Sequence, residues 1–211
     1  SLNVLFNHLR NHINHIMNVD LCSKQNEMSF VLFEQIIIIL RTILRREDIG
    51  DIMIIYSTNI IDLIDRLIMV VKNMNSDAPK YYKSVIHMSK MFKAIQTSET
   101  SLAIKHHYCL KNKWLKLVIS WFRMSIQKKY DIENLAKPHR EMNLEKRDMD
   151  YLYIDTAMEA SKAIAYLTDN LPLEIFWSGS AEEVTRSKVV FFGKYFNVLL
   201  KCLKKSMDLQ D

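Results

Sequence analysis

A helical stripe of apolar residues that continues through residues 51–72 constrains the fold more than any other feature of the sequence. The stripe consists of Met53, Tyr56, Ile60, Leu63, Ile64, Leu67 and Val71. Steps of three and four residues are typical of an α-helix, whereas a half-buried strand alternates every two residues. Isoleucine also favours strands, as in the run Ile36–Leu40, but the period decides for a helix. We therefore predict a helix here, with Asp62 and Asp65 on its solvated face.

The same spacing predicts further helices before and after this one. They cover residues 2–17, 29–46, 80–95, 99–129, 151–168 and 180–203. Gly50 is the expected break between the second and third helices. Ser76 or Asp77 can cap the helix that follows residue 79, and Pro79 suits its first position because proline has no N–H to leave unpaired. Ile154, Ala157, Met158, Ala160, Ile164 and Leu167 form the expected apolar side of residues 151–168.

The whole chain is predicted to be all-α, an antiparallel stack of seven helices in a single domain, 1–211. It contains only three glycines and three prolines, so its elements must be few and long. A compact bundle and a slice of a HEAT/ARM-like α-solenoid both fit this description, and helices that need cover on two sides favour the solenoid slice. Residues 131–147 are polar and contain Pro138, so we predict an exposed, mobile loop there.

Positive charge is concentrated on the helix predicted at residues 99–129. Seven lysines and arginines and no acids lie between residues 100 and 130, whereas the whole chain has a net charge of +5. The candidate partner-binding residues are Lys105, Lys113, Lys116, Arg123, Lys128 and Lys129. Such a row of cations can meet an acidic protein surface or anionic lipid, although a solvated helix face is its commoner role. Trp114 and Trp121 lie on the apolar side of this helix, which argues against nucleic-acid binding.

Motifs for catalysis or for a cofactor are absent from the sequence. We find no nucleophile motif, glycine-rich phosphate loop or paired carboxylates, so neither enzymatic activity nor a cofactor is predicted. His8, His12 and His15 share one helix face, but no acid or thiol accompanies them, and an ordinary polar face is expected rather than a metal site. The run Ile36–Leu40 is far shorter than the roughly twenty residues of a membrane-spanning helix. Three widely spaced cysteines favour a reducing, intracellular setting. Because the chain begins at Ser1 and ends within a helical pattern, we expect it to be an excerpt from a longer protein.

Several short motifs in the second half of the chain match a known family. They are Lys111-Asn112-Lys113 with Trp121, Arg147-Asp148-Met149-Asp150, Ala157-Met158-Glu159-Ala160, Leu171-Pro172-Leu173, and Lys194-Tyr195-Phe196 followed by Leu199-Leu200. On these residues the chain resembles the region of neurofibromin-type Ras GTPase-activating proteins that lies just before their catalytic domain, and it is most similar to the fungal Ira members. The motifs are packing signatures and none of them is catalytic.

The resemblance implies a segment of a very large cytoplasmic regulator that turns Ras off by accelerating GTP hydrolysis. In that family an arginine from the activating domain stabilises charge on the transferring phosphate. The FLR-type signature of that domain is missing here, so neither Arg123 nor any other arginine is assigned this role. The expected function is a non-catalytic helical scaffold that positions the catalytic domain, with the rest of the regulator and, through it, Ras as partners.

An alternative function is a protein-interaction module that docks an acidic partner or an anionic membrane surface through its basic helix. The same region in animal members of the family has been linked to tubulin, whose surface is acidic. The sequence leaves open whether the parent protein associates with membranes or forms homo-oligomers.

Overall fold

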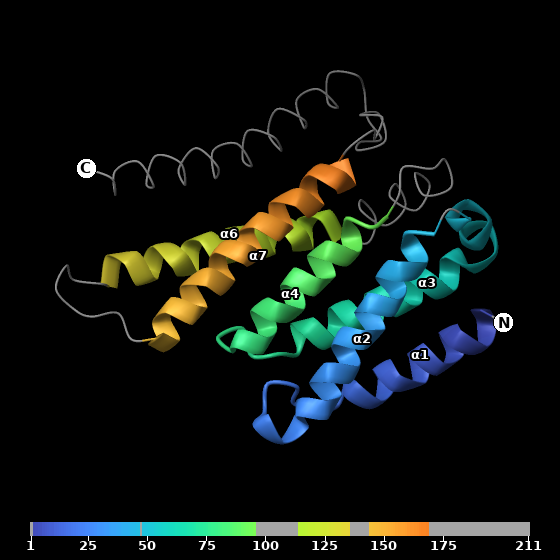
Figure 1. Ribbon diagram of the computed structural model, residues 1–211, viewed down its shortest axis with the longest axis horizontal. Coiled ribbons are helices and arrows are strands. Elements are labelled where there is room, and N and C mark those ends of the chain that lie inside the picture. The colour runs from blue at the N-terminus through green and yellow to red at the C-terminus, as the bar shows by residue number, and fades with distance from the viewer. Residues whose placement is uncertain (1, 47, 96–113, 136–143, 169–211) are drawn as a thin grey trace.

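The computed structural model describes residues 2–46, 48–95, 114–135 and 144–168, and all of its regular structure in these ranges is helical. The helices are α1 (Leu2–Ile16), α2 (Glu27–Leu44), α3 (Ile49–Lys72), α4 (Pro79–Phe92), α6 (Trp114–Leu135) and α7 (Leu144–Thr168), with a short 3-10 helix at Lys24–Asn26 (Figure 1). The all-α prediction is confirmed for this part of the chain. The helix expected at 180–203 and the first part of the helix expected at 99–129 lie outside the described residues.

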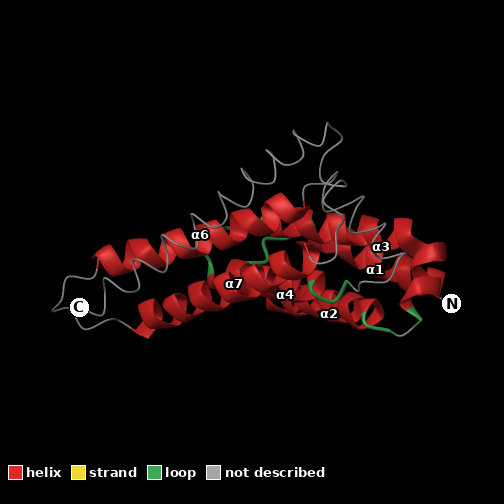
Figure 2. Cartoon of the chain, turned by 90° about the horizontal axis from the view of Figure 1, so that it is seen from above, coloured by secondary structure: helices red, strands yellow, loops and turns green. Residues whose placement is uncertain are grey.

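The helices form two layers, which Figure 2 shows edge-on: α1, α3 and α6 lie in one layer, and α2, α4 and α7 lie in the other. Within the layers α1 packs on α3, α2 on α4, and α4 on α7, while α6 packs across the layers on α7. Successive helices joined by short connections run in opposite directions (Figure 1). Stacked helix pairs of this kind are what an α-solenoid is built from, and the solenoid slice stays a prediction.

The core lies between the two layers and contains the stripe that the sequence predicts in α3. Ile60, Leu63 and Leu67 of this stripe are fully buried. Tyr56 is half-buried, and its ring centroid lies 5.4 Å from that of Phe6 on α1. The apolar face of α2 adds Phe30, Phe33, Ile36, Ile37, Leu40, Ile43 and Leu44 to the same core. Helical period alone therefore identified which side of α3 is buried.

The connections differ from the prediction at two positions. Gly50 is not a break but lies in the first turn of α3, where backbone N–H groups have no partner inside the helix and glycine disturbs little. Helix α2 already ends at Leu44, before α3 begins at Ile49. Pro79 takes the first position of α4 as predicted, but Ala78 is the N-cap residue and no side chain caps the helix. Instead, the Asn75 Oδ1 atom accepts a hydrogen bond of 3.0 Å from the Asp77 N–H, so the expected cap by Ser76 or Asp77 is wrong.

The predicted polar loop is shorter than expected because helices enter it from both sides. Helix α6 continues to Leu135 and α7 begins at Leu144. A proline disrupts a helix only near its own position, so Pro138 did not prevent helix formation at either end of the interval. Residues 136–143 lie outside the described residues.

The buried side of α7 matches the prediction only in part: Ala160, Ile164 and Leu167 are buried as expected. Ile154 and Met158 were expected in the core, but they are 38% and 45% exposed. The core face is rotated, because α4 and α6 both pack on this helix. Its buried residues are Tyr153, Thr156, Glu159, Ala160, Ala163, Ile164 and Leu167. Glu159 is the unexpected member of this face.

Candidate functional site

The basic face predicted on α6 is only partly available to a partner. Lys116 and Arg123 are exposed and lie seven residues apart, which places them on the same side of the helix. Neither forms an ion pair with another described residue. Lys105 and Lys113 lie outside the described residues. The described part of the basic face therefore presents two exposed cations.

The other two candidate cations, Lys128 and Lys129, contact acidic residues of neighbouring elements. Lys128 Nζ donates to Asp77 Oδ1 at 2.8 Å, which joins α6 to the turn before α4. Lys129 Nζ lies 3.7 Å from Asp150 Oδ1 on α7. Both lysines are half-buried. These contacts join α6 to its neighbours, which the sequence could not reveal because the acids are distant in the chain or on another helix.

Trp114 connects α6 to two other helices. Its indole N–H donates a hydrogen bond of 2.7 Å to Asp65 Oδ1 on α3, and its ring centroid lies 5.4 Å from that of Phe92 on α4. Burial raises the pKa of Asp65, while the bond from Trp114 favours the ionised form and opposes that rise. Asp65, predicted on a solvated helix face, instead takes part in helix packing.

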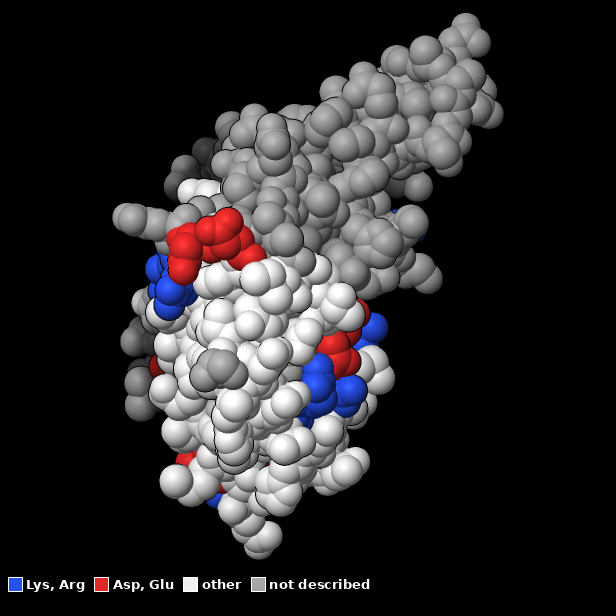
Figure 3. All heavy atoms as spheres, turned by 90° about the vertical axis from the view of Figure 1, so that its right-hand side faces the viewer, with Lys and Arg blue, Asp and Glu red and all other residues white. Residues whose placement is uncertain are grey.

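Asp62, the other aspartate predicted on the solvated face of α3, forms ion pairs with two arginines. Arg10 Nε on α1 lies 2.8 Å from Asp62 Oδ2, and Arg66 Nε lies 2.9 Å from Asp62 Oδ1. Burial alone would raise the pKa of Asp62, but the hydrogen bonds and charges of both arginines outweigh this effect and leave the pKa below its usual value. Figure 3, which shows the right-hand side of the molecule of Figure 1, likewise has basic and acidic side chains adjacent within a largely uncharged surface. Ion pairing thus joins α1 to α3.

Glu159 is the most buried charged side chain among the described ion pairs, at 8% exposure. Lys93, just beyond the end of α4, donates to Glu159 Oε2 at 3.2 Å, and Lys162 donates to Oε1 at 2.9 Å. Burial acts to raise the pKa of Glu159, but the two lysines outweigh it and lower the pKa. Both carboxylate oxygens therefore have a cationic partner, as a buried charge requires.

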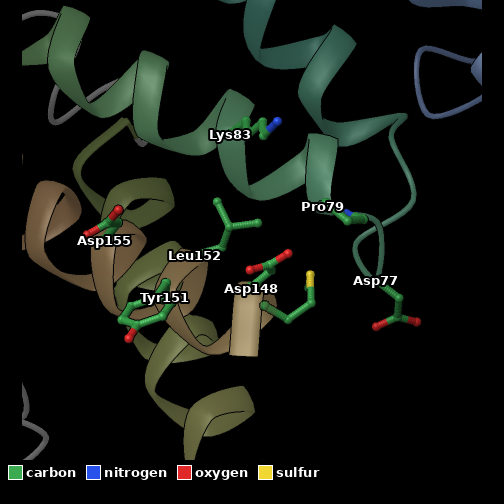
Figure 4. Close-up of a pocket in the computed structure, with 8 residues that line it drawn as sticks. Asp77, Pro79, Lys83, Asp148, Tyr151, Leu152 and Asp155 are labelled. Atoms are coloured by element: carbon green, nitrogen blue, oxygen red, sulfur yellow. The ribbon is translucent and has the colours of Figure 1, made fainter. Parts of the chain in front are cut away.

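A groove opens between the N-terminal ends of α4 and α7, with a volume of about 590 Å³ (Figure 4). Its lining combines apolar and charged side chains: Asp77, Pro79, Lys83, Asp148, Met149, Tyr151, Leu152 and Asp155. The sequence prediction missed it because α7 was expected to begin at Tyr151. Once the helix starts at Leu144, the spacing of Asp148, Tyr151 and Asp155 indicates a shared face.

The described residues offer little for metal or membrane chemistry. His8, His12 and His15 are exposed on α1, and no three histidine, cysteine or acidic side chains come together as metal ligands in the described ranges. Cys22 is a free thiol. Among the described helices, none combines the length and the apolar character that crossing a bilayer demands.

Comparison with known proteins identifies two relatives in Saccharomyces cerevisiae. The chain is 52% identical over 208 residues to the inhibitory regulator protein IRA2 and 54% identical over 209 residues to the inhibitory regulator protein IRA1. Each match covers 99% of this chain but only 7% of the relative. No family model matches the sequence, and no solved structure does. Over nearly its whole length the chain is thus a relative of one segment of these yeast regulators, which confirms its resemblance to the fungal Ira members.

Proposed function

We propose that this chain is a non-catalytic helical scaffold within a Ras GTPase-activating regulator, where it positions the catalytic domain. The observation that carries the proposal is the match along 99% of the chain to one segment of two inhibitory regulator proteins. The link to Ras comes from the resemblance to neurofibromin-type proteins, with which the Ira members are grouped. The chain spans 7% of the length of these relatives, so the activity on Ras belongs to the proposal.

The packing of the residues that carry the resemblance supports a scaffold role. Trp121 is 3% exposed, and Glu159 and Ala160 are buried. These contacts join α6 and α7 to the C-terminal end of α4: Trp121 lies next to the Phe92 ring, with a centroid distance of 6.3 Å, and Glu159 binds Lys93. Residues employed in this way fix the relative positions of helices rather than contact a substrate.

A GTPase assay with three proteins tests this function: the 211-residue chain, the full-length regulator, and the full-length regulator carrying Trp121→Ala. We expect the chain alone to leave GTP hydrolysis by Ras at its unstimulated rate. The full-length protein should accelerate hydrolysis, and Trp121→Ala should reduce that acceleration because it loosens the packing of α6. Stimulation by the chain alone would exclude a non-catalytic role. An undiminished rate with Trp121→Ala, in a protein whose segment is measurably destabilised, would exclude the positioning role.

Docking of an acidic partner by the basic face is a second candidate function, favoured by the exposure of Lys116 and Arg123 on one side of α6. Lys105 and Lys113 remain predicted members of this face. Tubulin and an anionic membrane surface are its predicted partners. An exposed row of cations attracts either one through charge and loses this attraction as salt screens it.

Reversing both exposed charges, with Lys116→Glu and Arg123→Glu, is expected to weaken binding to tubulin or to anionic vesicles about tenfold at low salt. The reason is that two attractive contacts become repulsive. Co-sedimentation at low and raised salt measures the effect. The matched control is Lys24→Glu with Arg45→Glu, which reverses two exposed charges on other elements. Equal weakening by both double variants would show that only net charge matters and would contradict a role for α6.

A further inference from the structure

The groove between α4 and α7 contains carboxylates that the fold itself does not use. Most described acidic side chains have a cationic or hydrogen-bonding partner, as Asp62 and Glu159 do. Asp148 and Asp155 form neither an ion pair nor a side-chain hydrogen bond with any other described residue. Both line the groove. Both are also exposed to solvent, so each carboxylate is available to a cation from outside the chain.

The two carboxylates flank an apolar surface. Asp148 and Asp155 are seven residues apart on α7, about 10.5 Å along the helix axis. Between them Leu152 lies toward α4 and the Tyr151 ring is 67% exposed (Figure 4). An arginine or lysine side chain is complementary to this surface. Its aliphatic part can cover the apolar residues while its charged group contacts a carboxylate or an aromatic ring face.

The other charged residues of the groove do not offset its preference for a cationic ligand. Asp77 is the third acid of the lining and is paired with Lys128, and Lys83 is the single basic residue of the lining. In Figure 4 Lys83 extends from α4, on the other side of the opening from Asp148 and Asp155. The unpaired charge on the α7 side is therefore negative.

Stabilisation of the helix itself does not account for Asp155. An acid near a helix N-terminus interacts favourably with the helix dipole, but the effect fades beyond the first turn. Asp148 lies just after the first turn of α7, which begins at Leu144, whereas Asp155 lies about three turns along it. Asp155 thus has no such explanation.

We propose that this groove binds a cationic helix of a partner protein, with arginine or lysine at two positions seven residues apart and apolar residues between them. A helix laid along α7 repeats the spacing of Asp148 and Asp155, so each of its cations meets one carboxylate. Its apolar residues cover Leu152 and Tyr151. Within the motif Arg147-Asp148-Met149-Asp150, Met149 packs against the core and Asp150 contacts Lys129, whereas Asp148 makes no such contact with a described residue. The inference does not depend on any action on Ras.

Fluorescence polarisation with the 211-residue chain and a labelled helical peptide tests the proposal. The peptide carries two arginines seven residues apart with leucines between them, and a second peptide has glutamine in place of both arginines. We compare the native chain with Asp148→Asn and Asp155→Asn, singly and together. The matched control is Asp51→Asn, which removes one exposed, unpaired charge from the first turn of α3, at the other end of the molecule. Circular dichroism checks that every variant keeps its helix content.

We expect saturable binding of the arginine peptide that weakens about threefold with each groove substitution and about tenfold with both. Raising the salt from about 50 to about 500 mM should weaken binding to the native chain more than binding to the double variant. The proposal is overturned if Asp51→Asn weakens binding as much as a groove substitution, because binding would then not depend on the carboxylates of the groove. Equal affinity for the glutamine peptide, or the absence of saturable binding, would also overturn it.

Discussion

Replacing Trp114 with alanine is expected to lower the free energy of unfolding by about 3–5 kcal/mol. This ring is 1% exposed and lies where α6 meets α3 and α4. The substitution removes the apolar contact with Phe92 and leaves a cavity in the core. It also removes the N–H from which Asp65 accepts a hydrogen bond. Burial already raises the pKa of that carboxyl. Because a domain of this size is stable by only about 5–15 kcal/mol in total, the variant should be close to unfolding.

Trp114→Phe separates the two contributions to this loss. Phenylalanine keeps much of the apolar surface but has no N–H for Asp65, so we expect a loss of about 1–3 kcal/mol. Urea titration followed by far-ultraviolet circular dichroism measures both variants. Lys116→Ala, two residues along α6 and exposed, is the control, with an expected change below about 0.5 kcal/mol. If Trp114→Ala changed stability no more than this control, the ring could not be part of the core.

Substitution of Glu159 by alanine should cost about 2–3 kcal/mol, because Lys93 is left partly buried without the carboxylate that it binds. Lys162→Ala breaks the other contact of Glu159 but removes a side chain that is already 44% exposed, so its cost should stay below about 1 kcal/mol. Replacing both members of the more buried pair with apolar residues, as Lys93→Met with Glu159→Leu, should recover most of the stability, since no unpaired charge then remains. Denaturant unfolding of the four proteins at pH 7 measures these differences.

The dependence on pH provides a second measure of Glu159. Its pKa is lowered in the folded state. The stabilisation is therefore complete above the pKa of an unfolded glutamate, about 4.3, and is lost as the pH falls through the lower, folded pKa. Between pH 5 and pH 3 the native chain should lose more stability than Glu159→Gln, which has no charge to lose. Parallel unfolding curves for the two proteins over this range would show that the carboxylate is not stabilised by its lysines.

Local pattern predicted the helices well and their ends less well. The apolar stripe of α3 is buried where the sequence placed it, because the helical period depends only on neighbouring residues. Gly50 and Pro138 were treated as breaks, but each acts within about one turn, and the surrounding residues decided whether a helix continued. In the turn before α4 the Asn75 side chain bonds to the backbone in place of the expected cap residues. Several side chains in this turn could form such a hydrogen bond, and the backbone conformation determines which of them does.

The site residues were predicted less well than the helices because their partners are distant in the sequence. Lys128 counted as a candidate for binding an external acid, yet its contact is Asp77, at a separation of 51 residues. Glu159 lies on the observed buried face of α7, outside the apolar side that was predicted, and the cation that stabilises it there is Lys93, at a separation of 66 residues. No local pattern contains such a pairing. Charge spacing on a helix shows where a side chain lies around the axis, but not which other helix faces it.

By itself the sequence determined that the described part of this chain is helical, because hydrophobic periodicity and the scarcity of glycine and proline are properties of short stretches. It also contained the motifs that relate the chain to the Ira proteins. Only the tertiary structure decided which charged side chains contact another element and which remain exposed. Asp65 and Lys128 make such contacts, whereas Lys116 and Asp155 are exposed. The physical reason is that an ion pair or a buried hydrogen bond depends on two groups meeting in space, and the packing of separate helices sets that distance.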